Sequence, residues 1–241
     1  MTVMSRFPGN GYLSGKIEGL APFGILARLP AMGRIVLRGT SAGVQHDRIG
    51  RVHRVGRSGG TALVRGACHE AIVDLAALSG IVIHRAPDPL RGSDPRLDFL
   101  DMGGMPIFSV VGIDGFGRFD PVLSRMQHSP VRRPARPPIV LPSPCPSMPS
   151  DDPARWPFCR LCDTGAEVAI VLDRVGLRQV WRGRIEAFRV ASGCLDVISD
   201  DFGLQIPAGA VAGWQVGAGR IAAIGPQGRP IGLCLASEAF A

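Results

Sequence analysis

Short apolar stretches broken by glycine make up most of the first half of the chain. From Gly33 to Val55 apolar and polar residues alternate in short runs, and glycines at positions 39, 43, 50 and 56 separate or end the runs. Alternation with a period of two predicts strands with one buried face, and glycines at this spacing are typical of the turns between them. A meander of antiparallel strands is therefore expected in this region.

Two segments of the first half instead show helical spacing. Residues 67–79 place Ile72, Leu75 and Leu78 three residues apart, which predicts a helix with one apolar face. A shorter helix is expected over residues 23–29.

The rest of the first half predicts more sheet. A strand is expected over residues 80–84. Apolar residues at 97–100 and 107–111 flank a turn of sequence DMGG at 101–104, which is typical of a β-hairpin. The pattern indicates an α+β chain in which sheet predominates.

A segment of different composition follows. Residues 128–155 are dominated by Pro, Ser and Arg. Because proline has no N–H to donate to a sheet and holds the backbone extended, this segment is predicted to be a linker. It separates a first repeat, residues 1–127, from a second repeat, residues 156–241.

The two parts on either side of this linker resemble each other. Residues 35–37 and 54–55 recur 135 positions later, residues 77–80 recur at 210–213, and residues 104–107 recur at 228–231. A repeat far longer than the roughly 20 to 50 residues of a solenoid indicates two copies of a domain. Two similar halves that face each other form a cleft, so a ligand is expected between them.

Composition narrows the class of protein. Of 241 residues, 46% are hydrophobic and 20% are charged, which suits a folded globular chain. No apolar run approaches the roughly 18 residues of a membrane span, and the first 15 residues lack the apolar stretch of a signal peptide, so we expect a cytoplasmic protein. The net charge of +7 comes from 26 arginines and a single lysine. Their scatter, with only one tyrosine, disfavours nucleic acid as a partner and admits anionic ligands.

Six cysteines stand at the irregularly spaced positions 68, 145, 159, 162, 194 and 234. This spacing favours reduced thiols over a disulfide framework. Cys159 and Cys162 form a single CxxC pair, without the second pair or the histidines of a zinc site. We interpret the pair as part of an ordered turn and keep a zinc or thiol protein as an alternative.

Several stretches in both halves follow the pattern of one known family. Residues 29–38 resemble its LPxLGxVxxxxR, residues 97–104 its SLQFFDxxG hairpin, residues 179–185 its QIHSGPV, residues 195–206 its LNVLDPxFNLHL, and Trp214 falls on the Trp of its WVVRKP strand. On these stretches, spread over residues 29 to 235, the chain resembles the HemS/ChuX-type haem-utilisation proteins, which degrade or carry haemin in bacterial iron uptake.

This resemblance implies a fold and a ligand. The fold is α+β, with two structurally similar repeats, each a mainly antiparallel β-sheet with flanking helices. The ligand is haem, held between the repeats near the linker. The segments that form larger helical parts in the family are short in this chain, which therefore resembles a shortened and divergent member.

The haem-binding residues of the family are not carried over. Its iron-binding His, in an AVHKVY strand, corresponds to Phe108, whose phenyl ring cannot bind iron. The Arg of its DLRLF stretch falls near Ala71, and its other histidines correspond to Gly165, Trp181 and Gln205. The resemblance therefore carries over the scaffold without the site. Some shorter relatives also have Phe in that strand, so Phe108 alone does not exclude haem.

Two of the five histidines are candidate haem ligands, because imidazole binds haem iron. His69 is the candidate metal ligand, since it precedes the segment that walls the cleft in the family. A solvated histidine that caps the next helix is the alternative. His128 at the start of the linker is the second candidate, with a solvated residue as the alternative. His46 and His53 are expected on exposed strand faces, and His84 at a strand end.

Three arginines are candidates for pairing with the haem propionates. Arg38, Arg65 and Arg85 are nominated because guanidinium forms charge-assisted, often bidentate hydrogen bonds with carboxylates. No Gly-rich phosphate loop, acid–base pair of carboxylates or Ser-His-Asp order stands out in the sequence.

Three hypotheses of function follow. The first is a cytoplasmic haem-binding, haem-utilisation protein that acts as a carrier or buffer, with haem degradation left open because no reductant site is identifiable. The second is a family member that has lost haem and acts as a non-enzymatic binding or interaction module. The third is the CxxC protein. The sequence decides neither enzymatic turnover nor oligomeric state, and a homodimer remains open.

Overall fold

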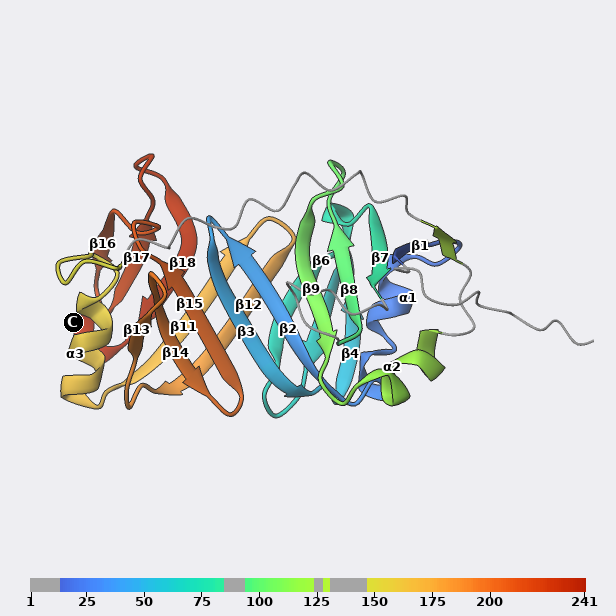
Figure 1. Cartoon of the computed structure of the whole chain (residues 1–241), viewed down its shortest axis with the longest axis horizontal. Coiled ribbons are helices and arrows are strands. Elements are labelled where there is room, and N and C mark those ends of the chain that lie inside the picture. The colour runs from blue at the N-terminus through green and yellow to red at the C-terminus, as the bar shows by residue number, and fades with distance from the viewer. Residues whose placement is uncertain (1–13, 85–93, 124–127, 131–146) are drawn as a thin grey trace, which may run out of the picture.

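Two antiparallel β-sheets make up most of the molecule (Figure 1). The computed structural model of the chain describes residues 14–84, 94–123, 128–130 and 147–241. Within these ranges the sheets have ten and eight strands, and the helices are few and short. The predicted predominance of sheet is confirmed, and the flanking helices are smaller than an α+β description suggests. No helix in the described ranges is long and apolar enough to cross a membrane.

The spatial order of the strands in each sheet differs from their order along the chain. The ten-stranded sheet consists, from one edge to the other, of β10 (His128–Pro130), β1 (Ser14–Ile17), β7 (Gly80–His84), β8 (Arg96–Leu100), β9 (Pro106–Gly112), β2 (Arg34–Ser41), β3 (Val44–Arg51), β15 (Phe202–Pro207), β14 (Cys194–Ser199) and β13 (Arg189–Ala191). The eight-stranded sheet consists of β16 (Gly213–Gly217), β17 (Arg220–Ile224), β18 (Pro230–Ala236), β11 (Glu167–Arg174), β12 (Leu177–Arg184), β6 (Glu70–Asp74), β5 (Thr61–Arg65) and β4 (Arg54–Ser58).

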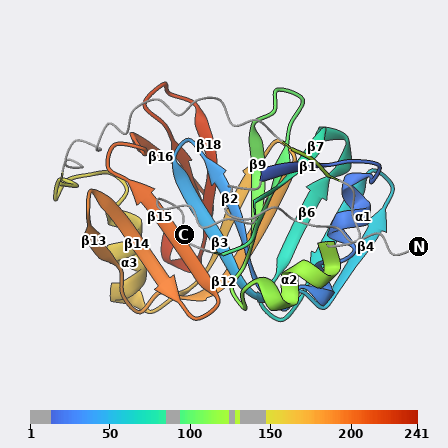
Figure 2. The same ribbon diagram turned by 45° about the vertical axis from the view of Figure 1, so that its right-hand side comes forward.

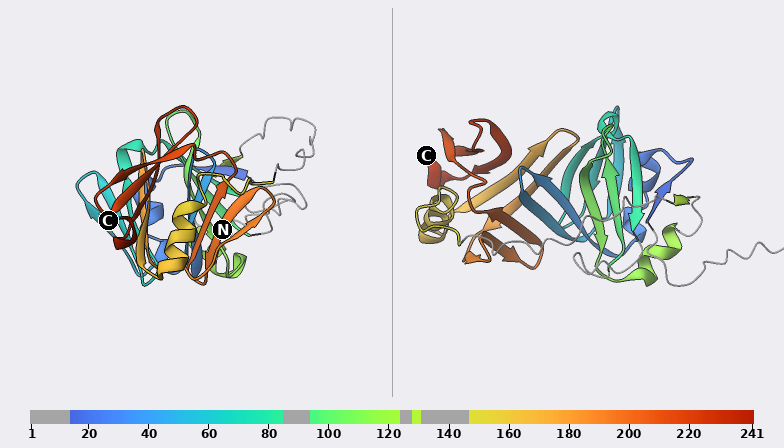
Figure 3. Two further views of the ribbon diagram at one scale, coloured as in Figure 1. Left: turned by 90° about the vertical axis from the view of Figure 1, so that its left-hand side faces the viewer. Right: turned by 45° about the horizontal axis from the view of Figure 1, so that its top comes forward.

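The helices lie at the ends and edges of this framework. They are α1 (Pro22–Leu26), α2 (Phe116–Leu123) and α3 (Trp156–Thr164), with 3₁₀ turns at Leu29–Ala31, Leu75–Ala77 and Glu238–Phe240. Helix α3 stands at the end of the molecule that carries the C-terminal strands (Figure 3). It carries Cys159 and Cys162, which form no disulfide. The CxxC pair is therefore on a helix, and its assignment to a turn is wrong.

Each half of the chain contributes strands to both sheets. β4, β5 and β6 join the sheet of the second half through the pairing of β6 with β12, and β13, β14 and β15 join the sheet of the first half through the pairing of β15 with β3 (Figure 2). One sheet per repeat was expected. The exchange of three strands in each direction corrects that expectation, because alternation of apolar residues marks a strand without specifying its partner.

The order of strands from β2 to β9 recurs from β11 to β18. The turn at Ala42-Gly43 corresponds to the turn at Val175-Gly176, and from there to β7 and β16 equivalent positions lie 133 residues apart. Leu37 is thus equivalent to Ile170, whereas the sequence comparison matched it with Leu172. The match was displaced by two residues. Such a displacement preserves the alternation of buried and exposed side chains, so the hydrophobic pattern does not reveal it.

The predicted helix over residues 67–79 is wrong. Glu70–Asp74 form strand β6, in which Ala71 and Val73 are buried and Ile72 points outward. β6 pairs with β5 on one side and β12 on the other, so its backbone groups are satisfied by two ladders. Tertiary pairing overrides the helical spacing in this segment. The strand over 80–84 is confirmed as β7, the hairpin as β8–β9, and the short helix as α1, which is confined to Pro22–Leu26.

Two hydrophobic cores lie between the sheets. The first includes Leu37, Phe99 and Phe108 together with Val64 and Val73 of the exchanged strands. The second includes Ile170, Trp181 and Leu235 together with Phe202 and Leu204. Each core is thus built almost entirely by one half of the chain and is closed by the strands that this half contributes to the other sheet. The two cores meet where β3 lies beside β15 and β12 lies beside β6.

Candidate functional site at the seam between the halves

The structure separates the nominated site residues. His69 and Arg65 lie at the junction of the two halves, Arg38 lies on a face of the ten-stranded sheet, Arg85 lies outside the described residues, and His128 is described only as part of the backbone of β10. Because His128 is in a strand that pairs with β1, the start of the expected linker belongs to the sheet.

We call the junction of the halves the seam. It is formed by side chains of β3, β12, β15 and the turn before β6, namely His46, Arg48, His69, Trp181, Asp201 and Phe202. All of them except Asp201 are buried. A buried cluster of titratable groups in a chain with an apolar core is expected either to be fully hydrogen-bonded or to serve a function.

Arg48 has few partners for a buried guanidinium. Its Nη2 donates to Asp201 Oδ2 at 3.2 Å, while Nε and Nη1 have no hydrogen-bond partner in the described structure. Burial lowers the pKa of Arg48 from its ordinary value. Trp181 Nε1 donates to the other oxygen of Asp201 at 3.2 Å. One half-exposed carboxylate thus holds both a guanidinium and an indole.

His69 is 3% exposed, and neither of its ring nitrogens makes a hydrogen bond of normal geometry among the described residues. The Gly50 backbone lies close enough to act as a weak acceptor for the ring, which partly offsets the effect of burial on the pKa of His69. Burial, with the neighbouring positive charge of Arg48, lowers the pKa of His69 to about 4. The imidazole is therefore neutral at physiological pH. A neutral ring with an unpartnered nitrogen has the donor chemistry of a metal ligand.

A tight turn holds His69 in place. The backbone N–H of Gly66 donates to the His69 carbonyl at 3.0 Å, and the reverse bond measures 3.4 Å. Gly66 packs so closely on β3 that a Cβ there would lie 2.3 Å from the carbonyl oxygen of Arg51. The alternative for His69, a solvated histidine that caps a helix, is wrong, because the side chain is buried and the segment that follows is a strand.

His46 and Gln179 make equivalent contacts from opposite halves. His46 Nε2 lies 3.4 Å from the Ile170 carbonyl, and Gln179 Nε2 donates to the Leu37 carbonyl at 2.8 Å. Both side chains are fully buried, so the expectation that His46 faces solvent is wrong. Burial lowers the pKa of His46 to about 3.

Aromatic rings complete the seam. Trp181 stacks on Phe202 with ring centroids 4.4 Å apart and an interplanar angle of 9°. The edge of His46 meets the same phenyl ring at 5.0 Å, and the Arg48 guanidinium lies 6.0 Å from its centroid.

Exposed basic residues lie on the strand ends near the turn that carries His69. We call them the cationic rim: Arg51, His53, Arg54, Arg65 and Arg182. Glu70 accepts a hydrogen bond from Arg182 and lies 3.7 Å from Arg65. The backbone N–H of His53 donates to the Arg65 carbonyl at 2.8 Å, which fixes the strand ends side by side. One carboxylate among five cationic or titratable side chains leaves the rim attractive to anions.

Arg38 is committed to a different partner. Its Nε and Nη2 donate to the two oxygens of Asp47 at 2.9 and 2.7 Å, a bidentate pair that raises the pKa of Arg38. Because Leu37 points into the core, Arg38 lies on the opposite, outer face of the sheet. Arg38 therefore does not contribute to the seam.

The position that the resemblance assigns to the haem histidine is filled. Phe108 is 2% exposed and stacks on Phe99 with ring centroids 4.4 Å apart and an interplanar angle of 13°. The pair lies in the first core, so iron has neither a donor nor room there.

Sequence reasoning missed a hydrogen-bonded series on the outer face of the ten-stranded sheet. Ser14, His84 and Asp98 come from β1, β7 and β8 and are joined in that order. They are far apart in sequence, and only the register of the three strands brings them together. No sequence signal marks this series.

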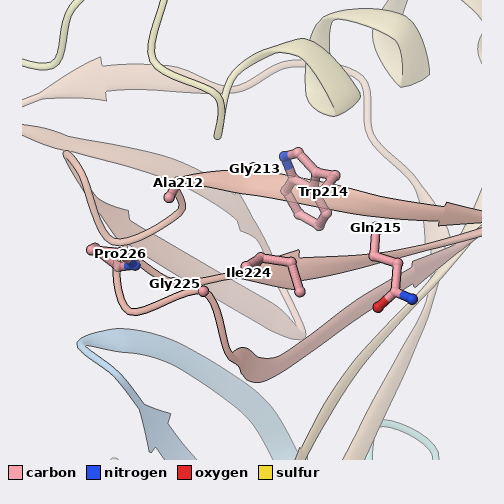
Figure 4. Close-up of a pocket in the computed structure, with 8 residues that line it drawn as sticks. Ala212, Gly213, Trp214, Gln215, Ile224, Gly225 and Pro226 are labelled. Atoms are coloured by element: carbon pink, nitrogen blue, oxygen red, sulfur yellow. The ribbon is translucent and has the colours of Figure 1, made fainter.

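Hollows also lie at the end of the molecule that carries α3. The first, of about 490 Å³, lies between β16 and the turn after β17, with Trp214, Gln215 and Ile224 along it (Figure 4). The second, of about 680 Å³, is lined by residues of α3 and the segment before it, including Trp156 and Cys159. The rings of Trp156 and Trp214 meet edge to face at 6.5 Å.

The CxxC pair does not form a metal centre with other described residues. No group of three or more His, Cys, Asp or Glu that could hold a metal occurs in the part of the chain that the structure describes. Burial raises the pKa of the Cys162 thiol, which disfavours its thiolate.

The fold of the chain is similar to that of proteins of known structure. No family model and no curated protein matches the chain. Among solved structures, the chain is similar to PhuS, a heme-binding protein from Pseudomonas aeruginosa, with 12% identity and a TM-score of 0.69 over 93% of this chain and 81% of that chain. It is also similar to ChuS, a heme degrading enzyme of Escherichia coli O157:H7, with 14% identity and a TM-score of 0.72 over the same shares. At these identities the likeness shows a shared fold, and the predicted resemblance is confirmed at that level.

Proposed function

We propose that this chain, which has the fold of the haem proteins PhuS and ChuS, binds haem or a related flat anionic tetrapyrrole at the seam and acts as a carrier or buffer. His69 is the proposed iron ligand. The observation that carries the proposal is a buried, neutral imidazole without a hydrogen bond of normal geometry at either ring nitrogen, at the junction of the two halves.

The chemistry of the donor suits the group. Burying the ring of His69 without a hydrogen bond of normal geometry costs free energy in the absence of a ligand. His69 would hold haem through a ring nitrogen, because haem, when bound, would supply an iron that imidazole can ligate. While His69 is buried, its pKa of about 4 keeps the ring neutral at physiological pH, the form in which a ring nitrogen can bind iron.

The cationic rim suits the acidic edge of such a ligand. Arg65 and Arg182 are exposed and share a single carboxylate, Glu70, so both retain N–H donors for a propionate. Arg65 keeps its nominated role. Arg182 takes the place of Arg38, whose guanidinium is already held by Asp47.

Binding requires the turn Gly66–His69 to move outward. Two backbone hydrogen bonds close this turn, and its residues Ala67 and Cys68 are at least partly exposed. Local opening of so short a segment costs far less than global unfolding. His69 then reaches the surface next to the rim without disruption of either core.

A second candidate is a family-like scaffold that has lost haem and serves as a non-enzymatic binding module. The stacked pair Phe99–Phe108 favours it, because the position expected for a haem ligand has become part of the core. This candidate requires His69 to stay buried at all times.

A haemin titration followed by the Soret band separates the two candidates. We expect saturable one-to-one binding at micromolar or tighter affinity, about −8 kcal/mol or better. His69→Ala should lose the shifted Soret band and weaken binding by at least about tenfold. His53→Ala is the matched control, since this exposed histidine lies in the same rim, and it should leave the band in place. His128→Ala tests the other nominated ligand.

Each other outcome contradicts part of the proposal. If the spectrum of the wild-type mixture equals the sum of the spectra of free haemin and free protein, the second candidate, a binding module that has lost haem, is favoured. Haemin binding that is retained in His69→Ala and lost in His128→Ala would assign the iron ligand to His128 instead of His69. Thermal unfolding of each variant is measured first, so that loss of binding is not confused with loss of fold.

A further inference from the structure

The outer face of the ten-stranded sheet carries a hydrogen-bonded series of Ser14, His84 and Asp98. Ser14 Oγ lies 2.8 Å from His84 Nδ1, and His84 Nε2 lies 2.9 Å from Asp98 Oδ2. The register aligns Ser14 directly opposite His84 across β1 and β7, and β8 brings Asp98 from the other side. The three functional groups are therefore fixed by three paired strands rather than by loops.

The ionisation of Asp98 defines the tautomer of His84. Burial alone would raise the pKa of Asp98, but hydrogen bonds from His84 and Ser109 and the charge of Arg96 lower it to about 2. The carboxylate accepts from Nε2–H, which leaves Nδ1 as an acceptor for the Ser14 hydroxyl. A serine hydroxyl, an imidazole acceptor and an orienting carboxylate are the three parts of an activated nucleophile.

The exposure of the series suits a reaction at its serine end. Asp98 is 4% exposed, whereas Ser14 is partly exposed and the His84 side chain is 28% exposed. The orienting group is thus buried and the nucleophile is reachable. Lys16 lies two residues along β1 on the same face, and Arg96 contacts Asp98 at 2.6 Å. Their positive charges favour a negative charge developing on this face.

We propose that Ser14, with His84 as general base and Asp98 as its positioning residue, forms a nucleophilic site that hydrolyses carboxylic esters through an acyl-serine. The proposal rests on this geometry and is independent of haem binding, because the series lies on the outer face and the seam lies between the cores.

The reaction is balanced with an ester and water alone. Ser14 Oγ adds to the carbonyl carbon while its proton passes to His84 Nδ1 and the carbonyl π electrons move to oxygen. As the carbonyl re-forms, the bond to the alcohol oxygen breaks and that oxygen takes the proton from Nδ1. Water then repeats both steps on the acyl-serine, which releases the acid and restores Ser14.

Labelling of the full-length protein with a fluorophosphonate probe tests the proposal. We expect one label per chain, mapped to Ser14 by peptide mass. Ser14→Ala should abolish it, and His84→Ala should slow it by about 10² to 10⁴, the usual contribution of a general base. Ser129→Ala is the matched control, because that exposed serine on neighbouring β10 bonds to Glu18 rather than to an imidazole. It should label like the wild type.

Hydrolysis of p-nitrophenyl acetate by the same variants supplies a second readout. Turnover should follow labelling, with loss in Ser14→Ala and in His84→Ala and retention in Ser129→Ala. No label on the wild type, or a label whose rate is unchanged in His84→Ala while thermal unfolding shows that variant to be folded, would overturn the proposal. The series would then be a structural ladder between strands.

Discussion

The two halves place different chemistry on equivalent positions of the seam. Arg48 of the first half corresponds to Trp181 of the second, and His69 corresponds to Phe202, each 133 residues further on. The second half fills its positions with stacked rings, whereas the first half leaves guanidinium and imidazole nitrogens unpartnered. One half thus contributes packing and the other contributes polar groups with unused hydrogen-bonding capacity. In a duplicated scaffold, ligand chemistry is best sought where the copies differ.

The largest expected loss of stability comes from removing one of the stacked rings that the second half contributes to the seam. Trp181→Ala removes a ring that is 5% exposed and stacked on Phe202, and should lower the free energy of unfolding by about 3–5 kcal/mol. Trp156→Ala is the control, since Trp156 is 41% exposed, and should cost less than half as much. Urea unfolding of both variants measures the difference. Equal losses would mean that the stacked ring does not stabilise the seam.

The buried histidines of the first half should make the free energy of unfolding depend on pH. Burial lowers the pKa of His46 to about 3 and of His69 to about 4, below the ordinary 6.5. The unfolded chain therefore binds more protons, and stability is complete above pH 6.5 and falls as the pH drops towards the folded values. At pH 5 each histidine should cost about 2 kcal/mol. Asp98, whose pKa is about 2, adds its loss only below about pH 4.

A substitution that gives the first half the residue of the second half separates the contribution of His69 to this pH dependence. His69→Phe introduces the residue that stands at the equivalent position, Phe202, and removes one of the two buried titrating groups. Its urea unfolding between pH 7 and pH 5 should show about half of the wild-type loss. The same pH dependence in both proteins would place His69 in water rather than in the seam.

A smaller loss of stability is expected from removing Asp201, whose carboxylate accepts hydrogen bonds from Arg48 of the first half and Trp181 of the second. Asp201→Ala removes the acceptor of both Arg48 and Trp181 and should cost about 1–2 kcal/mol, reduced because Asp201 is partly exposed. Asp173→Ala is the control, since its pair with Arg178 is half exposed on both sides, and it should change stability by less than about 0.5 kcal/mol. Equal unfolding midpoints for the two variants would contradict a buried role for Arg48.

Parts of the fold could be read from the sequence because they depend on local pattern. The hairpin at residues 97–111 and the strand at 80–84 follow from short-range alternation and turn residues. The segment 67–79 could not, since Ile72, Leu75 and Leu78 fit a helix as well as a strand followed by a 3₁₀ turn. The exchange of strands between the sheets is set by long-range pairing, which a local pattern does not encode.

Less of the candidate site than of the fold could be predicted from the sequence. His69 was nominated from its place in the family pattern, but its unpartnered nitrogens and its neighbour Arg48 follow from tertiary packing. Arg38 was nominated for its type, and only the structure reveals that Asp47 already holds it. The series from Ser14 to Asp98 spans 84 positions, 70 of them between Ser14 and His84, and sequence order gives no guide at such separations.

The exchanged strands also govern when the protein can fold. β6 pairs with β12, aligning Ala71 with Gln179, and β3 pairs with β15, aligning Gln45 with Gln205. During synthesis, β6 waits with one edge unpaired until β12 has emerged, and β3 waits until β15 has emerged. Pairings of such sequence separation form slowly, and open strand edges associate readily with other chains. We therefore expect the chain to be most prone to aggregation while only its first half has been synthesised.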